Sequence, residues 1–323
     1  MKVIASTGRE DIAVVYIVEL ENGKLVECVE SVQPPFSRLE KWIILVSTLY
    51  GCPVGCAMCD AGGYYQGKLS AEDILNQIDF MVKKRFADGK IPCRQFKIQF
   101  ARMGEPALNL QVLDVLETLP RRYDAPGLIP SISTIAPAGS QNFFERLLRI
   151  KKEYYSEGSF QFQFSLHTTD QFYRNKLIPI RTWTFAEMAA YGERFYAPGD
   201  RKITLNFALA RGIPLETEVL LAYFSPDKFL VKITPVNPTY RSMENQLISY
   251  IDPEAEDQAG EIVQALRAAG YTVIVSIGQV EENQVGSNCG QYLRTHLSVS
   301  KKMIEGYTFP IIQNNNYKNI IEQ

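Results

Sequence analysis

Short apolar stretches alternate with longer amphipathic segments along most of this chain. The apolar stretches have the length of strands, whereas the segments between them repeat apolar side chains every three or four residues. A capping box of Ser70 and Asp73 opens the first predicted helix. The pattern predicts strands at 42–48, 96–101, 131–135, 160–166, 202–210, 229–235 and 271–277, and further helices at 110–119, 141–155, 185–196, 215–224 and 253–269.

Strands that alternate with helices of this length indicate a parallel sheet with crossover helices, which is an α/β fold. Six β/α units, counted from residue 42, precede the last predicted strand. This number is too small for a closed eight-fold barrel and favours an open, partial (β/α)6 barrel. Functional side chains are then expected at the carboxyl ends of the strands.

The pattern divides the chain into three parts. Residues 12–20 and 24–29 predict a β-hairpin around Asn22 and Gly23, within an N-terminal extension of residues 1–41. The α/β core is expected to span residues 42–293. The C-terminal tail, residues 294–323, is polar and gives little structural signal.

Composition and charge narrow the classes of function only slightly. A net charge of −2 gives no sign of general affinity for nucleic acid, and basic runs such as 83–85 are interpreted as solvated helix faces. No apolar run is long enough to span a membrane, and charged residues come too early for a signal peptide. We therefore expect a cytoplasmic protein that makes no membrane contact.

Three of the six cysteines lie within eight residues, directly after the first strand of the core. Cys52, Cys56 and Cys59 have the spacing C-x3-C-x2-C. Three thiolates on a short loop suit a 4Fe-4S cluster, and they leave one iron open to chelate a small molecule. The alternative is a zinc site with a distant fourth ligand, but structural zinc sites usually repeat two ligand pairs and no second pair is present.

This cysteine spacing after a barrel strand resembles the signature of the radical S-adenosylmethionine (SAM) superfamily. The chain is most similar to one branch, the RlmN/Cfr family of adenine methyl synthases that act on ribosomal and transfer RNA. The similarity extends from about residue 11 to residue 293. The matching segments are 20–29, 46–62, 103–109, 131–134, 164–180, 233–238 and 287–293.

The resemblance implies a role for individual residues of this chain. It implies that Cys52, Cys56 and Cys59 hold a 4Fe-4S cluster that reductively cleaves SAM to a 5′-deoxyadenosyl radical. Residues that contact SAM would be Gly104, Glu105, Ser133, Ser165, Leu166, His167 and Asn237. Cys289 matches the methyl-carrying cysteine, and Glu27 matches an acidic residue that handles a proton. Each of these residues also has an ordinary structural interpretation, as a turn, a cap or a core residue.

The partners that the family implies are SAM, an external electron donor such as flavodoxin or ferredoxin, and an RNA substrate. A methyl carbon would pass through Cys289 to an adenine or another aromatic acceptor. RNA methyl synthases of the family carry a helical domain before the hairpin, whereas this chain begins almost at the hairpin, which counts against RNA.

Two positions of this chain depart from the family pattern. Leu45 stands where the family has its second catalytic cysteine, for which Cys28 or Cys93 could substitute, and Arg102 stands where a small residue is usual. A radical SAM enzyme of another reaction type, such as hydrogen abstraction and rearrangement on a small molecule, is the alternative hypothesis. A non-catalytic iron–sulfur protein is the second alternative.

Overall fold

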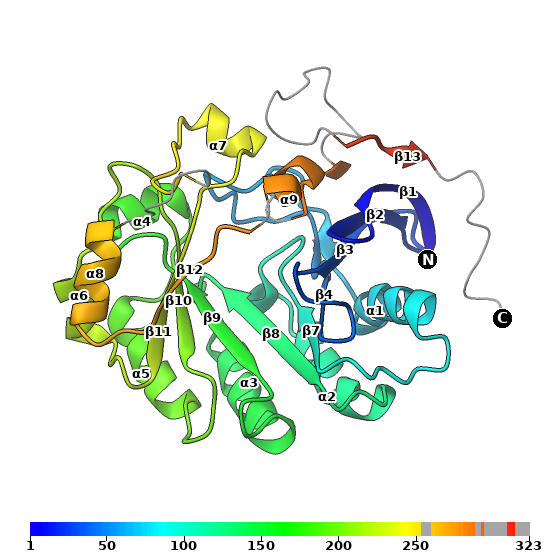
Figure 1. The fold of residues 1–323 in the computed structure, drawn as a ribbon, viewed down its shortest axis with the longest axis horizontal. Helices are drawn as coiled ribbons and strands as arrows, with labels where there is room; N and C mark the ends of the chain where they lie inside the picture. Colours follow the sequence, from blue (N-terminus) through cyan, green and yellow to red (C-terminus); the bar gives the residue numbers. More distant parts are fainter. Residues whose placement is uncertain (253–259, 279, 288–291, 294–308, 314–323) are drawn as a thin grey trace.

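The computed structural model describes residues 1–252, 260–278, 280–287, 292–293 and 309–313. Within them, neighbouring strands at the centre of the fold run parallel and follow one another in chain order (Figure 1). These strands are β4 (Lys41–Leu45), β7 (Gln95–Gln99), β8 (Leu128–Thr134), β9 (Gln161–Ser165), β10 (Ile203–Ala208), β11 (Phe229–Thr234) and β12 (Val273–Val275). The predicted α/β fold with a mostly parallel central sheet is confirmed.

Helices connect these strands and cover one face of the sheet. Because parallel crossovers are right-handed and each one here advances to the next strand in order, all the crossover helices lie on the same side. They are α1 (Ala71–Arg85), α2 (Gln111–Arg122), α3 (Gln141–Tyr154), α5 (Phe185–Phe195), α6 (Thr217–Tyr223) and α8 (Gly260–Ala268). The capping box of Ser70 and Asp73 is present at the start of α1, as predicted.

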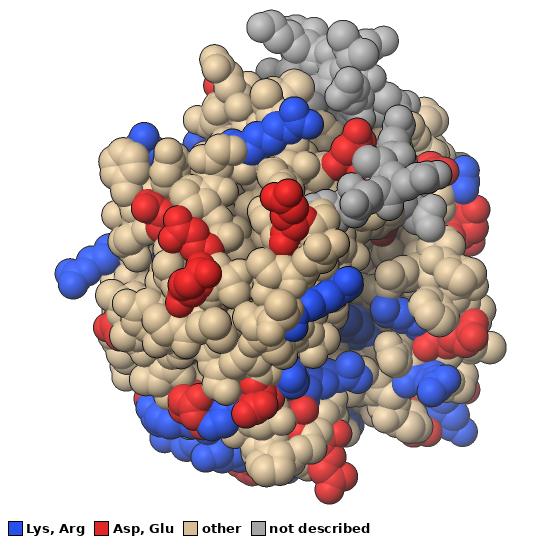
Figure 2. All heavy atoms as spheres, turned by 60° about the vertical axis from the view of Figure 1, so that its left-hand side comes forward, with Lys and Arg blue, Asp and Glu red and all other residues tan. Residues whose placement is uncertain are grey.

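The two faces of the parallel strands differ in chemistry. Side chains toward the helices are apolar and buried, such as Trp42 and Ile98. Side chains on the opposite face, which we call the open face, are mostly polar: Lys41, Lys97, Gln99, Ser133, Gln163, Ser165, Asn206 and Lys232. Figure 2 shows a hollow in this part of the molecule with Lys and Arg side chains on its walls.

The N-terminal extension is an antiparallel meander that continues the main sheet. The predicted hairpin is confirmed as β2 (Ala13–Glu19) and β3 (Leu25–Val32), and β3 pairs with β4. The strand β1 (Lys2–Arg9) was not predicted, because its inward side chains Val3, Ala5 and Thr7 give a weak apolar signal. The C-terminal tail also adds a strand to the sheet, which was not predicted: β13 (Ile312–Gln313) pairs with β1.

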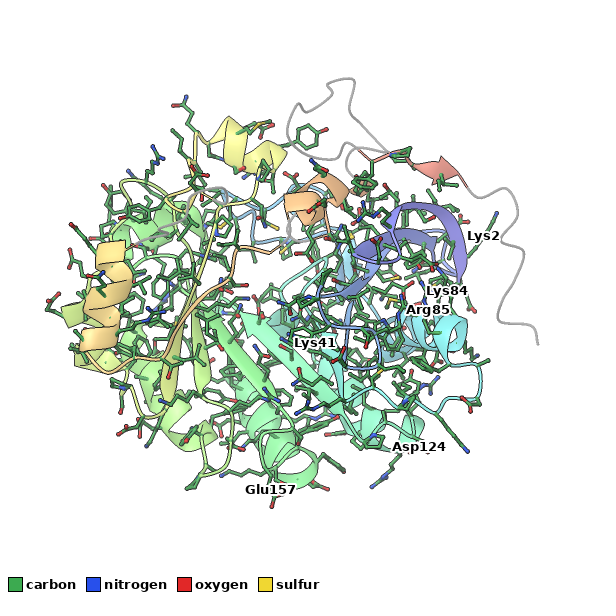
Figure 3. The ribbon with its side chains drawn as sticks, in the orientation of Figure 1. Lys2, Lys41, Lys84, Arg85, Asp124 and Glu157 are labelled. Atoms are coloured by element: carbon green, nitrogen blue, oxygen red, sulfur yellow. The ribbon has the colours of Figure 1, made fainter. Side chains whose placement is uncertain are left out.

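Lys83 at the end of α1 is exposed, as predicted, but Lys84 and Arg85 of the same basic run are not solvated. Lys84 and Arg85 point toward the meander (Figure 3). Arg85 donates two hydrogen bonds to the buried carboxylate of Glu30, and the Tyr16 hydroxyl donates a third. The charges therefore hold α1 against β2 and β3. In the part of the chain that the structure describes, no helix is long and apolar enough to cross a membrane.

Candidate functional site

The cysteine loop is a closed turn that follows the short strand β5 (Leu49–Tyr50), before β6 (Gly67–Lys68). The Cys52 amide donates to the Ala61 carbonyl at 2.7 Å, and the Cys59 amide donates to the Cys56 carbonyl at 3.2 Å. A Cβ at Gly62 would lie 2.8 Å from the Gly55 Cα, so the loop closes only with glycine there. This closure brings the ends of the cysteine segment together.

The cysteine side chains share one largely apolar environment. Burial raises the pKa of the Cys56 thiol, and Cys59 and Cys52 raise it further, which places the three sulfurs near one another. Thiolates so close together need a source of positive charge to be stable. The surrounding apolar side chains include Val54, Met58, Ile135, Leu177, Ile178 and Val236.

Two short helices fasten the cysteine loop to the ends of distant strands. In α7 (Tyr240–Glu244), the amides of Tyr240 and Arg241 donate to the buried carboxylate of Asp60 at 3.1 and 3.0 Å. In α4 (Gln171–Leu177), the last carbonyl accepts from the Ala57 amide at 2.9 Å. The loop is thus held by segments that follow β11 and β9.

Glu105, which follows Gly104, lies close to this loop. The Glu105 carboxylate is buried and accepts from the Thr134 hydroxyl, from the Ile135 amide at 3.0 Å and from the Ala107 amide at 3.0 Å. Burial raises the pKa of Glu105, while these hydrogen bonds act in the opposite direction. Its charge also raises the pKa of Cys52 and Cys56, so the carboxylate is close to the sulfurs.

Replacing Gly104 by alanine is expected to destabilise the protein by about 2 kcal/mol or more, from a steric clash added to backbone strain. Its φ is +105°, and a Cβ would lie 2.5 Å from the Leu49 Cγ. Gly63→Ala is the matched control, because Gly63 has φ +103° with nothing within 4 Å of a Cβ. Denaturant unfolding measures both variants, and equal losses of stability would rule out the clash.

The end of β9 carries the next predicted residues. The amides of Leu166 and His167 both donate to the Asn206 carbonyl of β10, at 2.9 and 3.2 Å. His167 Nδ1 accepts from the Ala208 amide at 3.1 Å, and burial lowers the pKa of His167 to about 4. The imidazole is therefore neutral at pH 7 and acts as an acceptor. Ser165 lies directly before this turn, at the last position of β9.

The remaining predicted SAM contacts lie on strands of the same sheet or directly after them. Ser133 is on the open face of β8, paired with Gln163 of β9. Asn237 follows β11, and its carbonyl accepts from the Thr239 amide at 2.8 Å and the Ser242 hydroxyl at 2.9 Å. These bonds position Asn237 immediately before α7, whose first amides bind Asp60 of the cysteine loop.

Arg174 is a residue of this site that the sequence reasoning did not single out. Its guanidinium is buried in α4 and donates to the Ile135 carbonyl at 3.0 Å and to the Thr182 hydroxyl. Burial lowers the pKa of Arg174 to about 10, and the nearby Cys56 opposes this effect. The Arg174 Nε is buried with no hydrogen-bond partner among the described residues. A cation so placed suits an anionic group bound at the cysteines.

The residues fit an iron–sulfur cluster better than a single metal ion. Among the described side chains, no three His, Cys, Asp or Glu residues converge closely enough to hold one ion. Ligands of a 4Fe-4S cluster bind separate irons and need not converge on one point. The soft donor set of three sulfurs and the unsatisfied Nε of Arg174 both agree with a bound anionic cluster.

Glu27 of β3 and Arg102, which follows β7, form a fully buried ion pair. The Arg102 Nε donates to the Glu27 carboxylate at 2.9 Å, and its Nη1 donates to the carbonyls of Gly286 and Ser287 at 3.0 and 3.1 Å. The Leu293 amide donates to the other oxygen of Glu27. Cys289 lies outside the described residues, between segments that this ion pair holds.

Both candidates for a second thiol are buried, and Cys28 lies on the helix side of the sheet. Cys28 follows Glu27 on β3, so strand alternation directs its side chain to the opposite face, where it is buried. Burial raises the pKa of Cys93 to about 11 and also raises that of Cys28. Leu45 is the last residue of β4 and pairs with Val29 and Gln99.

Comparison with known proteins identifies relatives across most of the chain. A protein of Petrotoga mobilis named "Probable dual-specificity RNA methyltransferase RlmN" is 26% identical over 281 residues, which are 84% of this chain and 75% of that protein. A protein of the same name from Acidothermus cellulolyticus is 29% identical over 278 residues, 80% of this chain and 60% of that protein. The chain is a relative of the RlmN-type radical SAM methyltransferases. It is an enzyme of methyltransferase-like type.

A solved structure supports the same relationship at the level of the fold. The crystal structure of a radical SAM methyltransferase from Sphaerobacter thermophilus has a TM-score of 0.62 with this chain. It shares 20% identity, over 90% of this chain and 81% of that one. No protein-family model matches the chain. The similarity to RlmN-type proteins thus comes from the sequence relatives, and the solved structure shows the fold.

Proposed function

We propose that this chain is a radical SAM enzyme that transfers a methyl carbon through Cys289 to an adenine or another aromatic acceptor. The observation that carries the proposal is the position of the cysteine loop, which lies beside Glu105 at the carboxyl ends of parallel strands. This is the edge of an α/β sheet at which ligands bind. In this proposal the parallel strands form a partial (β/α)6 barrel.

Cys52, Cys56 and Cys59 would hold a 4Fe-4S cluster, with Arg174 as a nearby cation. When bound, the cluster would supply the electron that cleaves SAM to a 5′-deoxyadenosyl radical. The chain's own residues bind and orient the cofactor. Those proposed to contact SAM are Gly104, Glu105, Ser133, Ser165, Leu166, His167 and Asn237. An external donor such as flavodoxin or ferredoxin would supply the electrons.

Two residues of the chain would act on the methyl group and on the substrate proton. The thiolate of Cys289 would take a methyl group from a first SAM, with S-adenosylhomocysteine as the leaving group. Glu27 is proposed to handle the proton that leaves the acceptor ring, and its carboxylate form is favoured by Arg102. The names of the relatives suggest RNA as the acceptor.

Mass spectrometry of the peptide that contains Cys289 tests the carrier step. We expect a mass increase of one methyl group on Cys289 in protein purified without oxygen after co-expression with iron–sulfur assembly proteins. Purification from cells depleted of SAM should yield the unmethylated peptide as the control. An unmodified Cys289 in protein with a full cluster and SAM present contradicts the carrier role.

A radical SAM enzyme of another reaction type remains the second candidate, and Leu45 favours it. A leucine cannot attack a methylthioether to release a product. Cys28 is buried on the opposite side of the sheet, and Cys93 is buried before β7. Cleavage of SAM to 5′-deoxyadenosine with an unmodified Cys289 would support this candidate.

A further inference from the structure

The buried basic side chains of the described chain differ in how their charge is balanced. They are Arg102, Lys151 and Arg174. Arg102 forms an ion pair with Glu27, and Lys151 forms one with Asp200. No carboxylate among the described residues forms an ion pair with Arg174, although this residue is only 1% exposed. A buried cation without an anion is unfavourable, so the comparison indicates that an anion from outside the polypeptide completes the site.

The hydrogen bonds of Arg174 within the described chain go to neutral oxygens. The guanidinium donates to the Ile135 carbonyl at 3.0 Å, to the Ser165 carbonyl at 3.4 Å and to the Thr182 hydroxyl. Its Nε is buried and has no hydrogen-bond partner among the described residues. These bonds orient the guanidinium, but they leave its charge uncompensated and one N–H donor unsatisfied.

The side of α4 that carries Arg174 lies against the cysteine loop. Leu177 and Ile178 follow Arg174 by three and four residues, so they lie on the same side of the helix. Both belong to the apolar cluster that Cys56 contacts. The Leu177 carbonyl also accepts from the amide of Ala57, the residue after Cys56, at 2.9 Å. The contacts of the helix therefore direct the Arg174 side chain toward the cysteine loop.

A second set of contacts gives the same position. The Ile135 carbonyl accepts from Arg174, and Ile135 belongs to the apolar cluster that Cys56 contacts. Electrostatics agree with these contacts, since burial lowers the pKa of Arg174 to about 10 while the charge of Cys56 acts to raise it. The anion that completes the site is therefore expected at the cysteines, where three thiolates would give a 4Fe-4S cluster a net negative charge.

We propose that Arg174 is the counter-ion of the iron–sulfur cluster and raises its reduction potential. One-electron reduction adds a negative charge to the cluster, and the electron comes from the external donor. A nearby cation stabilises this added charge, and burial keeps water and salt from screening the interaction. This inference rests on the proposed function, because it requires a cluster at Cys52, Cys56 and Cys59.

The reduction potential of the cluster-reconstituted protein tests the inference. It is measured by titration with dithionite, followed by electron paramagnetic resonance of the reduced cluster. We expect Arg174→Gln to lower the equilibrium constant for one-electron reduction about tenfold or more, which is a shift of about 59 mV or more to lower potential. Arg174→Lys keeps the positive charge and should keep most of the potential.

Lys151→Met is the matched control. Lys151 is also a buried cation, but it lies near the carboxyl end of α3, which leads to the amino end of β9 and so to the edge of the sheet opposite the cysteine loop. Its replacement leaves Asp200 unpaired and should lower the stability without changing the potential. A purely structural role of Arg174 would give this same pattern in Arg174→Gln.

Several results would overturn the counter-ion. One is an unchanged potential in Arg174→Gln with a full cluster, and another is an equal fall of potential in Arg174→Gln and Arg174→Lys. A loss of SAM affinity in Arg174→Gln with no change of potential would assign the cation to the SAM carboxylate instead. If Arg174→Gln folds but retains no iron, full iron in Arg174→Lys supports the counter-ion, whereas loss of iron in both variants overturns it.

The same preparations separate this inference from the proposed function. Absence of a 4Fe-4S signal in the unchanged protein after reconstitution overturns the proposed function itself. A 4Fe-4S signal whose potential does not respond to Arg174→Gln overturns only the counter-ion. A potential that responds, without release of 5′-deoxyadenosine from SAM in the presence of dithionite, supports the counter-ion and overturns only the proposal of SAM cleavage.

Discussion

Replacing Cys56 by alanine is expected to abolish the iron–sulfur chromophore and reductive SAM cleavage, with a loss of activity of at least about 1,000-fold, a barrier increase of roughly 4 kcal/mol. Each thiolate would bind a separate iron of the proposed cluster, so two cysteines would not retain it as three would. Cys56 lies between Cys52 and Cys59 and next to the Arg174 charge. Iron and sulfide content, visible absorption and 5′-deoxyadenosine release measure the effect.

Cys93→Ala is the matched control for this experiment. Cys93 is also buried, but it lies before β7 and outside the cysteine loop. Its loss should cost a small amount of stability, about 1 kcal/mol, and should leave the iron content unchanged. Full iron content and SAM cleavage in Cys56→Ala would contradict the assignment of the cluster.

Replacing Arg102 by methionine is expected to lower the free energy of unfolding by about 3–5 kcal/mol, because Glu27 would remain buried without its cation. The double variant Arg102→Met/Glu27→Gln should recover most of this loss, since a neutral amide is less costly to bury than a carboxylate. Both side chains are fully buried in the ion pair. Denaturant unfolding of the single and double variants measures the coupling.

The loss of stability caused by Arg102→Met should depend on pH. The pKa of Glu27 determines the direction of this dependence. Burial already raises the pKa of Glu27 above its ordinary 4.5, and Arg102 opposes this rise. Without Arg102, the Glu27 carboxyl group should keep its proton to a higher pH in the folded state than in the unfolded state. The variant should therefore be least impaired near pH 4.5 and should lose stability as the pH rises above this value.

An exposed ion pair provides the control for the buried one. Arg194 and Glu145 are 2.6 Å apart, and about half of each side chain is exposed. Arg194→Met should cost less than about 1 kcal/mol, because water and salt screen exposed pairs. Equal losses in the two single variants, or no recovery in the double variant, would contradict the buried-charge explanation.

The relation between Arg102 and the C-terminal segment explains a departure from the family pattern. Arg102 was noted in the sequence only as a large residue at an unusual position. In sequence, Arg102 is 75 residues from Glu27 and more than 180 residues from Gly286 and Ser287. In the fold it forms hydrogen bonds with all three. A contact between such distant segments leaves no local signal in either of them.

The sequence by itself determined the order of the elements, because apolar periodicity and capping residues act over a few positions. The capping box at Ser70 and the cysteine spacing are both local, and both could be read directly. The strand β1 escaped detection since Ala5 and Thr7 are only weakly apolar, although the sheet buries them. Local signals therefore identified the cysteine loop and most of the strands.

Only the tertiary structure decided which charges meet. It brings Arg174 to the cysteine loop, and Lys84 and Arg85 to Glu30. Each of these residues is an ordinary basic residue in its own segment. Burial and neighbouring charges set the energy of a charged side chain, and both depend on strands and helices that are distant in the chain.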